Sequence, residues 1–368
     1  KLGYVKRWVQ RDTLGPSMRP VVKRLEVTPV ARYAFAREKL TGMLRAGYRS
    51  TNSRVTLEGG RYVEQFNNEA PIHPVVNTFT TLFMEKNLMK LYEQDFVNIG
   101  YRQLLNDKIT VATQGHLARR HELFNASGFT LVDSGKEAYT TNEPDNKLLV
   151  TTGFRDHNAL TASVALEVRP WQKFRIRNGR KGPVQDSSPL ITLSYKKGIE
   201  GPFNSSVDFD LIEVGYKHAI RMGIRGKLDV AMKGGKFIND HKMYFMDYAH
   251  FLGNQTPFIT TDPVGSFRLL DYYLYSTNDK YFTANAHYHF RKFLITRFPL
   301  VRLTGVTENI FVNYLATPLS DDYTELGYSL DGILRIFRLE GAVSFSEGHY
   351  QSFGFRIGVA TSVGVNFD

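Results

Sequence analysis

No cysteine occurs among the 368 residues of the sequence. Without cysteine the chain cannot form disulfides, thiolate zinc sites or iron–sulfur clusters, and it has no thiol nucleophile. Long apolar runs are missing as well. No window approaches the roughly 18 consecutive apolar residues of a membrane-spanning helix, so the sequence predicts no helical membrane segment.

Motifs of catalysis are also missing. The sequence contains neither a Gly-x-Ser-x-Gly elbow nor a His-Glu-x-x-His motif. The glycine pair Gly234-Gly235 lacks the spacing of a phosphate-binding loop. We therefore expect a protein that is not an enzyme and that binds no cofactor and no metal ion.

What the chain does contain is aromatic and basic residues. It has 20 Tyr and 26 Phe, and 47 Lys+Arg against 36 Asp+Glu, which gives a formal net charge of +11. Apolar residues make up 42% of the chain, too many for a disordered protein. The positive charge suits nucleic acid, an anionic membrane surface or an acidic partner, and composition does not choose among them.

Alternation of polar and apolar residues is the dominant pattern. From Tyr281 to Arg291, apolar residues such as Phe282 alternate with polar ones such as Asn285 and His287. This run is longer than the usual globular strand of about 5–6 residues. The same period predicts strands near 30–37, 42–49, 53–66, 91–105, 108–121, 159–169, 189–198, 206–222, 225–236, 242–250, 266–276, 281–291, 306–316, 323–331, 334–346 and 350–360.

Long strands with Arg, His, Glu and Asn on their polar faces, and Tyr and Phe near their ends, predict an all-β fold. Specifically, we expect a transmembrane antiparallel β-barrel of about 14–16 strands. Short connections such as Ser346–His349 alternate with long ones at 122–158, 170–188 and 251–265, which predicts long loops on one side. A soluble sandwich or propeller would also show alternation, so that alternative stays open.

The barrel is expected to occupy residues 76–368. Residues 1–75 form either its first strands or an adjoining periplasmic segment. One stretch near 77–90 departs from the strand pattern, because Phe79 and Phe83 follow Asn77, a possible N-cap, at helical spacing. This stretch predicts a short helical segment that either braces or plugs the barrel or connects two strands at its rim.

Six ordered stretches resemble a known family. They are Asn77–Tyr92, Arg119–Asn125, Ser188–Gly198, Asp247–Asn254, Ser266–Leu270 and Tyr323–Tyr328. Together they are similar to the C-terminal region of a Bacteroidetes-type outer-membrane β-barrel family of unknown function, whose members often carry an N-terminal carboxypeptidase-regulatory-like domain. The resemblance covers about residues 50–360 and implies the outer membrane of a Gram-negative bacterium.

A weaker similarity is to the barrel-assembly and two-partner-secretion superfamily. Its members have a long loop with an Arg-Gly-aromatic motif, followed by about five closing strands. Here the loop 251–265 leads to Phe267-Arg268, although Leu269 stands where the motif has glycine.

Arg268 is the first candidate functional residue. A bidentate pair with a carboxylate of the lumen would tie the long loop to the barrel wall. The alternative is a solvated arginine in the lumen or at the rim. The candidate partners of Arg268 are Asp271, Glu308 and Glu340.

Other polar residues allow two interpretations each. Asp247 and His250 could supply two metal ligands, but no third is identifiable, and a hydrogen-bonded network with Asn254 that shapes the loop is the simpler explanation. Charges of the closing strands predict either an ion-selecting ring or pairs across the interior; they are Arg335, Arg338, Arg356, Glu308, Glu325 and Glu340.

The basic pairs Arg119-Arg120 and Lys196-Lys197, at strand ends, would contact anionic lipid head groups.

We therefore expect a non-enzymatic outer-membrane β-barrel in an envelope complex for outer-membrane protein assembly or protein export. A porin-like pore or transport channel is one alternative. A structural anchor for lipoprotein or periplasmic partners is another. The expected partners are outer-membrane lipid and proteins of that complex, and not nucleic acid.

Overall fold

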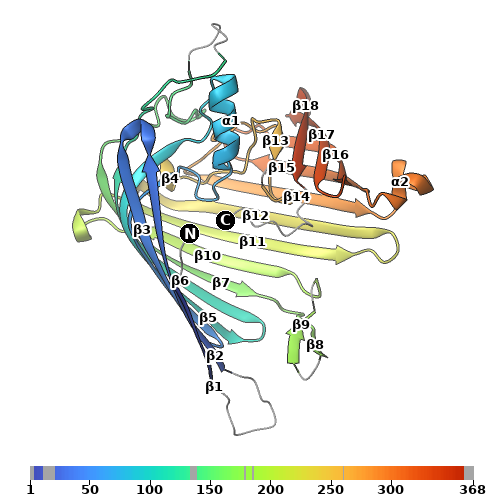
Figure 1. The fold of residues 1–368 in the computed structure, drawn as a ribbon, viewed down its shortest axis with the longest axis horizontal. Helices are drawn as coiled ribbons and strands as arrows, with labels where there is room; N and C mark the ends of the chain where they lie inside the picture. The colour runs from blue at the N-terminus through green and yellow to red at the C-terminus, as the bar shows by residue number, and fades with distance from the viewer. Residues whose placement is uncertain are drawn as a thin grey trace.

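One large β-sheet dominates the computed structural model, which describes residues 4–10, 21–132, 139–177, 180–184, 186–259 and 261–359 (Figure 1). The sheet has 16 strands. They are β1 (Tyr4–Gln10), β2 (Val21–Ala34), β3 (Lys39–Arg49), β4 (Ser53–Gln65), β5 (Leu91–Asn106), β6 (Ile109–His121), β7 (His157–Val168), β10 (Leu190–Gly198), β11 (Asp208–Arg221), β12 (Gly226–Lys242), β13 (Phe258–Ile259), β14 (Lys280–Phe290), β15 (Thr307–Ala316), β16 (Tyr323–Ile333), β17 (Phe337–Ser346) and β18 (His349–Val359).

The remaining elements are small. β8 (Phe174–Arg177) and β9 (Arg180–Pro183) form a separate two-stranded sheet. The helices are α1 (Pro74–Met84), α2 (Pro299–Leu303) and the 3-10 turns η1 (Phe35–Arg37), η2 (Pro202–Asn204), η3 (Phe245–Asp247) and η4 (Ile295–Arg297). No helix within the described ranges is long and apolar enough to cross a membrane.

Strands follow one another through the sheet in chain order, each antiparallel to its neighbours, except for β13 at the end. β1 to β4 pair onward into β5, so they belong to the same sheet as the later strands. No described pairing joins β1 to β18, so the closed barrel expected from the sequence is not seen. The outer edge of β18 is instead occupied in part by β13, which runs parallel to it.

The two faces of the sheet have opposite character. On the face that we call the outer face, Leu193 of β10 pairs in register with Leu166 and Val214, and all three side chains are exposed. On the opposite, inner face, Asn313 of β15 pairs with Glu325 of β16, and both are buried. A soluble sheet buries its apolar face and exposes its polar one, so this sheet has the inverse arrangement.

Residues 243–279 connect β12 to β14 as a long loop, which we call the inner loop. The strands predicted at 242–250 and 266–276 are therefore wrong. β12 and β14 pair directly with each other, which leaves no free strand edge between them. The apolar residues of the loop pack instead in a core cluster with Phe209 and Leu315 of the sheet.

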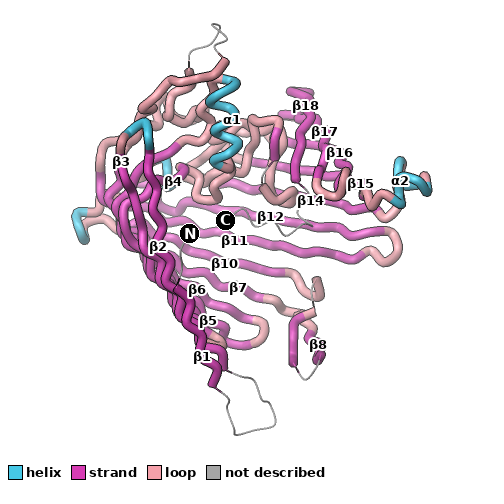
Figure 2. The backbone as a smooth tube through the Cα atoms, in the orientation of Figure 1, coloured by secondary structure: helices cyan, strands magenta, loops and turns pink. Residues whose placement is uncertain are grey.

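Most of the long connections leave the sheet at one end, where α1 also lies (Figures 1 and 2). Because successive strands alternate in direction, the long segment with β8 and β9 lies at the opposite end, beside tight turns such as 222–225. The expectation that all long loops share one side is therefore wrong for 170–188. The short connection Ser346–His349 likewise lies at the end that carries the long loops.

Helix α1 begins earlier than expected. His73 caps it, its Nδ1 accepting from the Val75 N–H at 3.3 Å, and Pro74 occupies a first-turn position that needs no N–H donor. Asn77 is not the N-cap. Asn77 lies within the helix, and its Oδ1 accepts from the backbone N–H groups of Leu88 (3.0 Å) and Met89 (2.8 Å) beyond the helix, which orients the chain as it enters β5.

Candidate functional site

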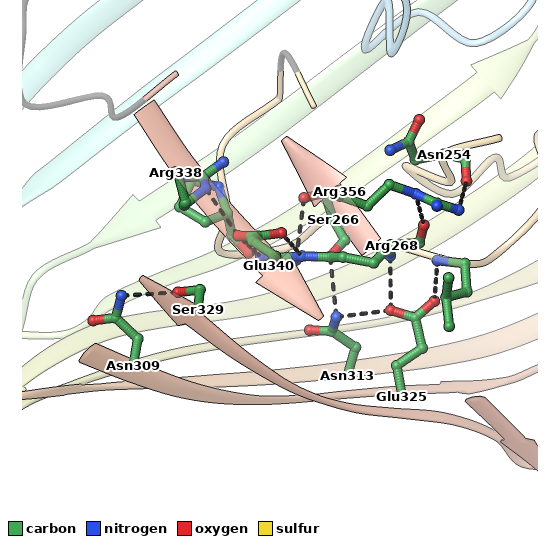
Figure 3. A network of polar contacts seen from close by, with 12 residues as sticks. Asn254, Ser266, Arg268, Asn309, Asn313, Glu325, Ser329, Arg338, Glu340 and Arg356 are labelled. Carbon is green, nitrogen blue, oxygen red and sulfur yellow. Dashed lines mark hydrogen bonds and ion pairs between the residues drawn. The ribbon is translucent and has the colours of Figure 1, made fainter. Parts of the chain in front are cut away.

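Arg268 of the inner loop has a fully buried side chain, with 0% exposed. Its Nε and Nη2 donate to the two carboxylate oxygens of Glu340 on β17, at 2.7 and 3.2 Å (Figure 3). Its Nη1 donates to the carbonyl of Pro263 at 2.9 Å and to that of Ser266. The guanidinium thus organises the loop around itself and joins it to β17.

Glu325 of β16 binds the backbone of the same segment. Its Oε2 accepts from the Arg268 N–H at 2.7 Å, and its Oε1 accepts from Leu269 at 2.7 Å and from Leu270 at 3.1 Å. Successive backbone N–H groups of this kind form a concave anion site. Here the anion is a carboxylate of the sheet itself, so side chain and backbone attach the loop at two neighbouring strands.

Three more side chains complete what we call the Arg268 network. Asn313 Nδ2 donates to Glu325 at 3.2 Å and to the Ser266 carbonyl at 3.1 Å. Arg356 Nε donates to the Arg268 carbonyl at 2.8 Å, and Arg338 Nε lies 2.8 Å from Glu340 Oε1. The network consists of Arg268, Asn313, Glu325, Arg338, Glu340 and Arg356 (Figure 3).

Strand periodicity explains why these residues meet. Residues two apart share a face of a strand, so Arg338 and Glu340 both point inward while Leu339 between them is exposed on the outer face. Phe311 of β15 lies beside Arg268, its ring centroid 4.2 Å from Arg268 Cζ, a cation–π geometry. The ring fits because Gly327 has no Cβ, which would stand 2.0 Å from it.

A second buried ion pair holds the start of the inner loop. Arg120 of β6 donates from Nη1 and Nη2 to the two carboxylate oxygens of Asp247, at 2.7 and 2.8 Å. Both residues are buried. Burial acts to raise the pKa of Asp247, but the charge and hydrogen bonds of Arg120, together with the charge of Lys196, outweigh burial and hold that pKa below its usual value.

The inner loop is therefore attached on two sides of the inner face, at β6 through Asp247 and at β16 and β17 through Arg268. Removing one member of a buried pair leaves an uncompensated charge and destabilises strongly. The arrangement can hold a long loop across the inner face of the sheet.

Two of the three proposed partners of Arg268 were wrong. Glu340 is the residue that contacts it, whereas Asp271 is exposed in the loop. Glu308 lies on the outer face of β15, in the row of Ile310 and the exposed Val312, and accepts from the backbone N–H groups of residues 294–296. The sign of the charge was suitable, but the strand's alternation turns Glu308 away from the inner face.

His250 and Asn254 shape the inner loop. His250 Nδ1 lies 2.8 Å from Ser276 Oγ, and burial lowers the pKa of His250 to about 3, so its ring is neutral near pH 7. Asn254 Oδ1 accepts from the Thr256 N–H at 2.9 Å and from the Tyr272 hydroxyl at 3.1 Å. Asp247 has a different partner, Arg120, and in the part of the chain that the structure describes no group of three His, Asp or Glu side chains could hold a metal ion.

The basic pairs assigned to lipid head groups are mostly engaged elsewhere. Arg120 is buried against Asp247, while its neighbour Arg119 is exposed. Lys197 donates to both carboxylate oxygens of Asp210, at 3.0 and 3.1 Å. Lys196 lies over the ring of Phe209 on the inner side, 5.4 Å from its centroid. The lipid contact predicted for these pairs is therefore wrong for Arg120 and Lys196, because alternation turns them inward.

Sequence reasoning missed the partnership of Arg120 with Asp247 and the role of Glu325 as an acceptor for backbone groups. A charged residue within an alternating strand, on the face opposite the apolar row, is the signal that could have identified Arg120. No local signal identifies its partner, because the two residues are 127 positions apart. For Glu325, only the fold brings the backbone of residues 268–270 to its carboxylate.

The fold and the site define an all-β protein with a single large antiparallel sheet, a charged inner face and a loop bound across it. The chain matches the C-terminal domain of the family of unknown function DUF5686 over residues 5–330 and belongs to that family. Among curated proteins no sequence matches the chain.

A comparison with solved structures includes a mutant of the Rh. blastica porin. It is 8% identical in sequence, with a TM-score of 0.32, over 97% of this chain and 99% of the porin chain. Similarity at that level is too low to indicate a shared topology, so the fold assignment depends on the strand pairing alone.

Proposed function

We propose that this chain is an outer-membrane β-barrel of a Gram-negative bacterium. The main support is the inverse arrangement of the sheet, with rows of exposed apolar side chains on the outer face and buried charges on the inner face. Lipid favours such an apolar outer surface, and a barrel wall satisfies its backbone hydrogen bonds between strands. Closure of the sheet by a pairing of its first and last strands belongs to this proposal.

A charged substitution on the outer face tests membrane insertion. Val214→Arg should lower the free energy of unfolding by about 2–4 kcal/mol in lipid vesicles, because an arginine would face the hydrocarbon. Thr192→Arg, on the inner face of the neighbouring strand, is the matched control and should have a much smaller effect. Equal effects of the two variants, or none, would contradict a lipid-facing outer surface.

Within the envelope we propose a non-enzymatic role in outer-membrane protein assembly or protein export, together with other proteins. Support comes from the inner loop, which carries Phe267-Arg268, is bound across the inner face and is followed by the five strands β14–β18. This order is similar to that of the barrel-assembly and two-partner-secretion superfamily. A loop held across the lumen by buried ion pairs also suits a regulated passage better than a permanently open one.

A porin-like pore is the second candidate. It is favoured by a cavity of about 650 Å³ on the inner side of β4, β5 and β6, whose mixed lining includes the charged residues Glu64, Arg120 and Lys196. Water and ions could fill such a space.

Two measurements on the reconstituted chain separate these functions. For assembly, we expect the chain to accelerate the folding of a denatured outer-membrane barrel protein into vesicles, with little steady conductance, and deletion of residues 251–265 should abolish the acceleration. Arg54→Ala, at an exposed inner-face arginine, is the control and should retain it. Steady single-channel conductance that is unchanged by the deletion, without acceleration, would favour the pore and reject assembly.

A further inference from the structure

The connection between β14 and β15, residues 291–306, projects from the rim of the sheet and contains η4 and α2 (Figure 1). It leaves the sheet at the end that carries the tight turns. In outer-membrane barrels the tight turns face the periplasm, where the membrane leaflet consists of phospholipid. The position of this segment is thus at the level of one membrane surface.

Its side chains form an amphipathic set. Phe298, Leu300 and Leu303 are 65%, 80% and 81% exposed, although all three are large and apolar. The basic residues Arg291, Lys292 and Arg297 precede them in the chain and are exposed as well. None of these cations forms an ion pair with another described residue, so the segment presents apolar groups and unpaired positive charge together.

Glu308 determines on which side of the sheet this segment lies. Its carboxylate, on the outer face, accepts from the backbone N–H groups of Leu294 (3.1 Å), Ile295 (2.9 Å) and Thr296 (2.8 Å). The Tyr328 hydroxyl, from the outer row of β16, donates to the same carboxylate at 2.5 Å. The start of the segment therefore covers the outer face at the rim and does not fold over the inner face.

Aromatic rings continue from the outer face into the segment. The ring of Tyr288 lies 4.5 Å from that of Phe290, and Phe290 is stacked on Phe293 with 4.2 Å between centroids. Tyr288 and Phe290 share the outer row with the exposed Phe282. Aromatic side chains mark the membrane interface of such barrels, so the segment continues the surface that the proposed barrel would place in lipid.

We propose that residues 291–306 are an interfacial membrane anchor, with Phe298, Leu300 and Leu303 inserted among acyl chains and Arg291, Lys292 and Arg297 bound to anionic phospholipid head groups. This inference rests on the proposed outer-membrane location. Amphipathic segments with basic polar faces bind in this way, their apolar side chains about 5–10 Å below the head-group boundary. The occupant is a phospholipid surface because apolar and cationic groups are exposed side by side at the edge of the lipid-facing rows.

The absence of cysteine allows a direct test with single nitroxide labels. We would attach labels at Leu303→Cys, at Val312→Cys on the outer face, and at Phe124→Cys, an exposed aromatic position at the opposite end of the sheet. The full chain is reconstituted in phosphatidylethanolamine vesicles with or without phosphatidylglycerol. Accessibility to oxygen, which partitions into lipid, is compared with accessibility to a water-soluble nickel complex.

With phosphatidylglycerol present, the labels at 303 and 312 should be more accessible to oxygen, and the label at 124 to nickel. Omitting phosphatidylglycerol, or combining Lys292→Gln with Arg297→Gln, should shift the label at 303 towards water and leave the label at 312 unchanged. The anchor would be overturned if the label at 303 were in water, or if it were shielded from both reagents, as a protein partner would shield it. The barrel proposal would stand in either case as long as the label at 312 is in lipid. No response to phosphatidylglycerol would overturn the head-group assignment, and a label at 312 in water would reject the outer-membrane location itself.

Discussion

Arg268→Ala is expected to detach the inner loop from β16 and β17 and to lower the free energy of unfolding by about 3–5 kcal/mol, because it leaves a buried carboxylate without its main partner. In the native chain the guanidinium satisfies Glu340 and two loop carbonyls at once. The measurements are denaturant unfolding in vesicles and limited proteolysis, in which cleavage within residues 243–279 should become rapid.

Two variants separate the geometry of this arginine from its charge. Arg268→Lys keeps the charge but loses the planar fork, so its effect should be intermediate. Arg54→Ala removes an arginine that is exposed on the inner face and should change stability by less than about 1 kcal/mol. If Arg268→Ala behaved like Arg54→Ala in both measurements, Arg268 would not be what holds the loop.

Arg120→Ala has the second large expected effect. It removes both hydrogen bonds to the buried carboxylate of Asp247, and we expect a loss of about 3–5 kcal/mol. Protease sensitivity should appear first near the start of the inner loop, between residues 243 and 256. Arg119→Ala is a closely matched control, since Arg119 precedes Arg120 directly but is exposed.

The double variant Arg120→Ala with Asp247→Asn tests whether the lost stability comes from the stranded charge. A neutral amide is less costly to bury than an unpaired carboxylate, so the double variant should be more stable than Arg120→Ala alone. A double variant as unstable as the sum of its two single substitutions would mean that the two residues do not interact.

Much of the strand arrangement could be predicted from alternation alone. The placement of Asn285 and His287 on one face of the strand and of Phe282 on the other was predicted correctly, because side chains of a strand alternate between its faces whatever the strand pairs with. The outward direction of Glu308 was available from the same pattern, since it shares a row with Ile310 and Val312. The charge of Glu308 suggested a lumen position, whereas the period contradicts it.

The inner loop could not be recognised in this way. Residues 242–250 and 266–276 alternate like their neighbours, but a strand also needs an open edge to pair with, and β12 and β14 already pair with each other. Edge availability is a property of the whole sheet, so no local pattern reports it.

What the sequence by itself determined is the all-β class, the inner and outer side of most strands, and the absence of thiol chemistry, since these depend on residue type and a period of two. The tertiary structure alone decided which charges meet. Arg268 and Glu340 are 72 positions apart and Arg120 and Asp247 are 127 apart, and a charge specifies only the sign of its partner. The geometry that selects one carboxylate among many arises when the loop is bound across the inner face.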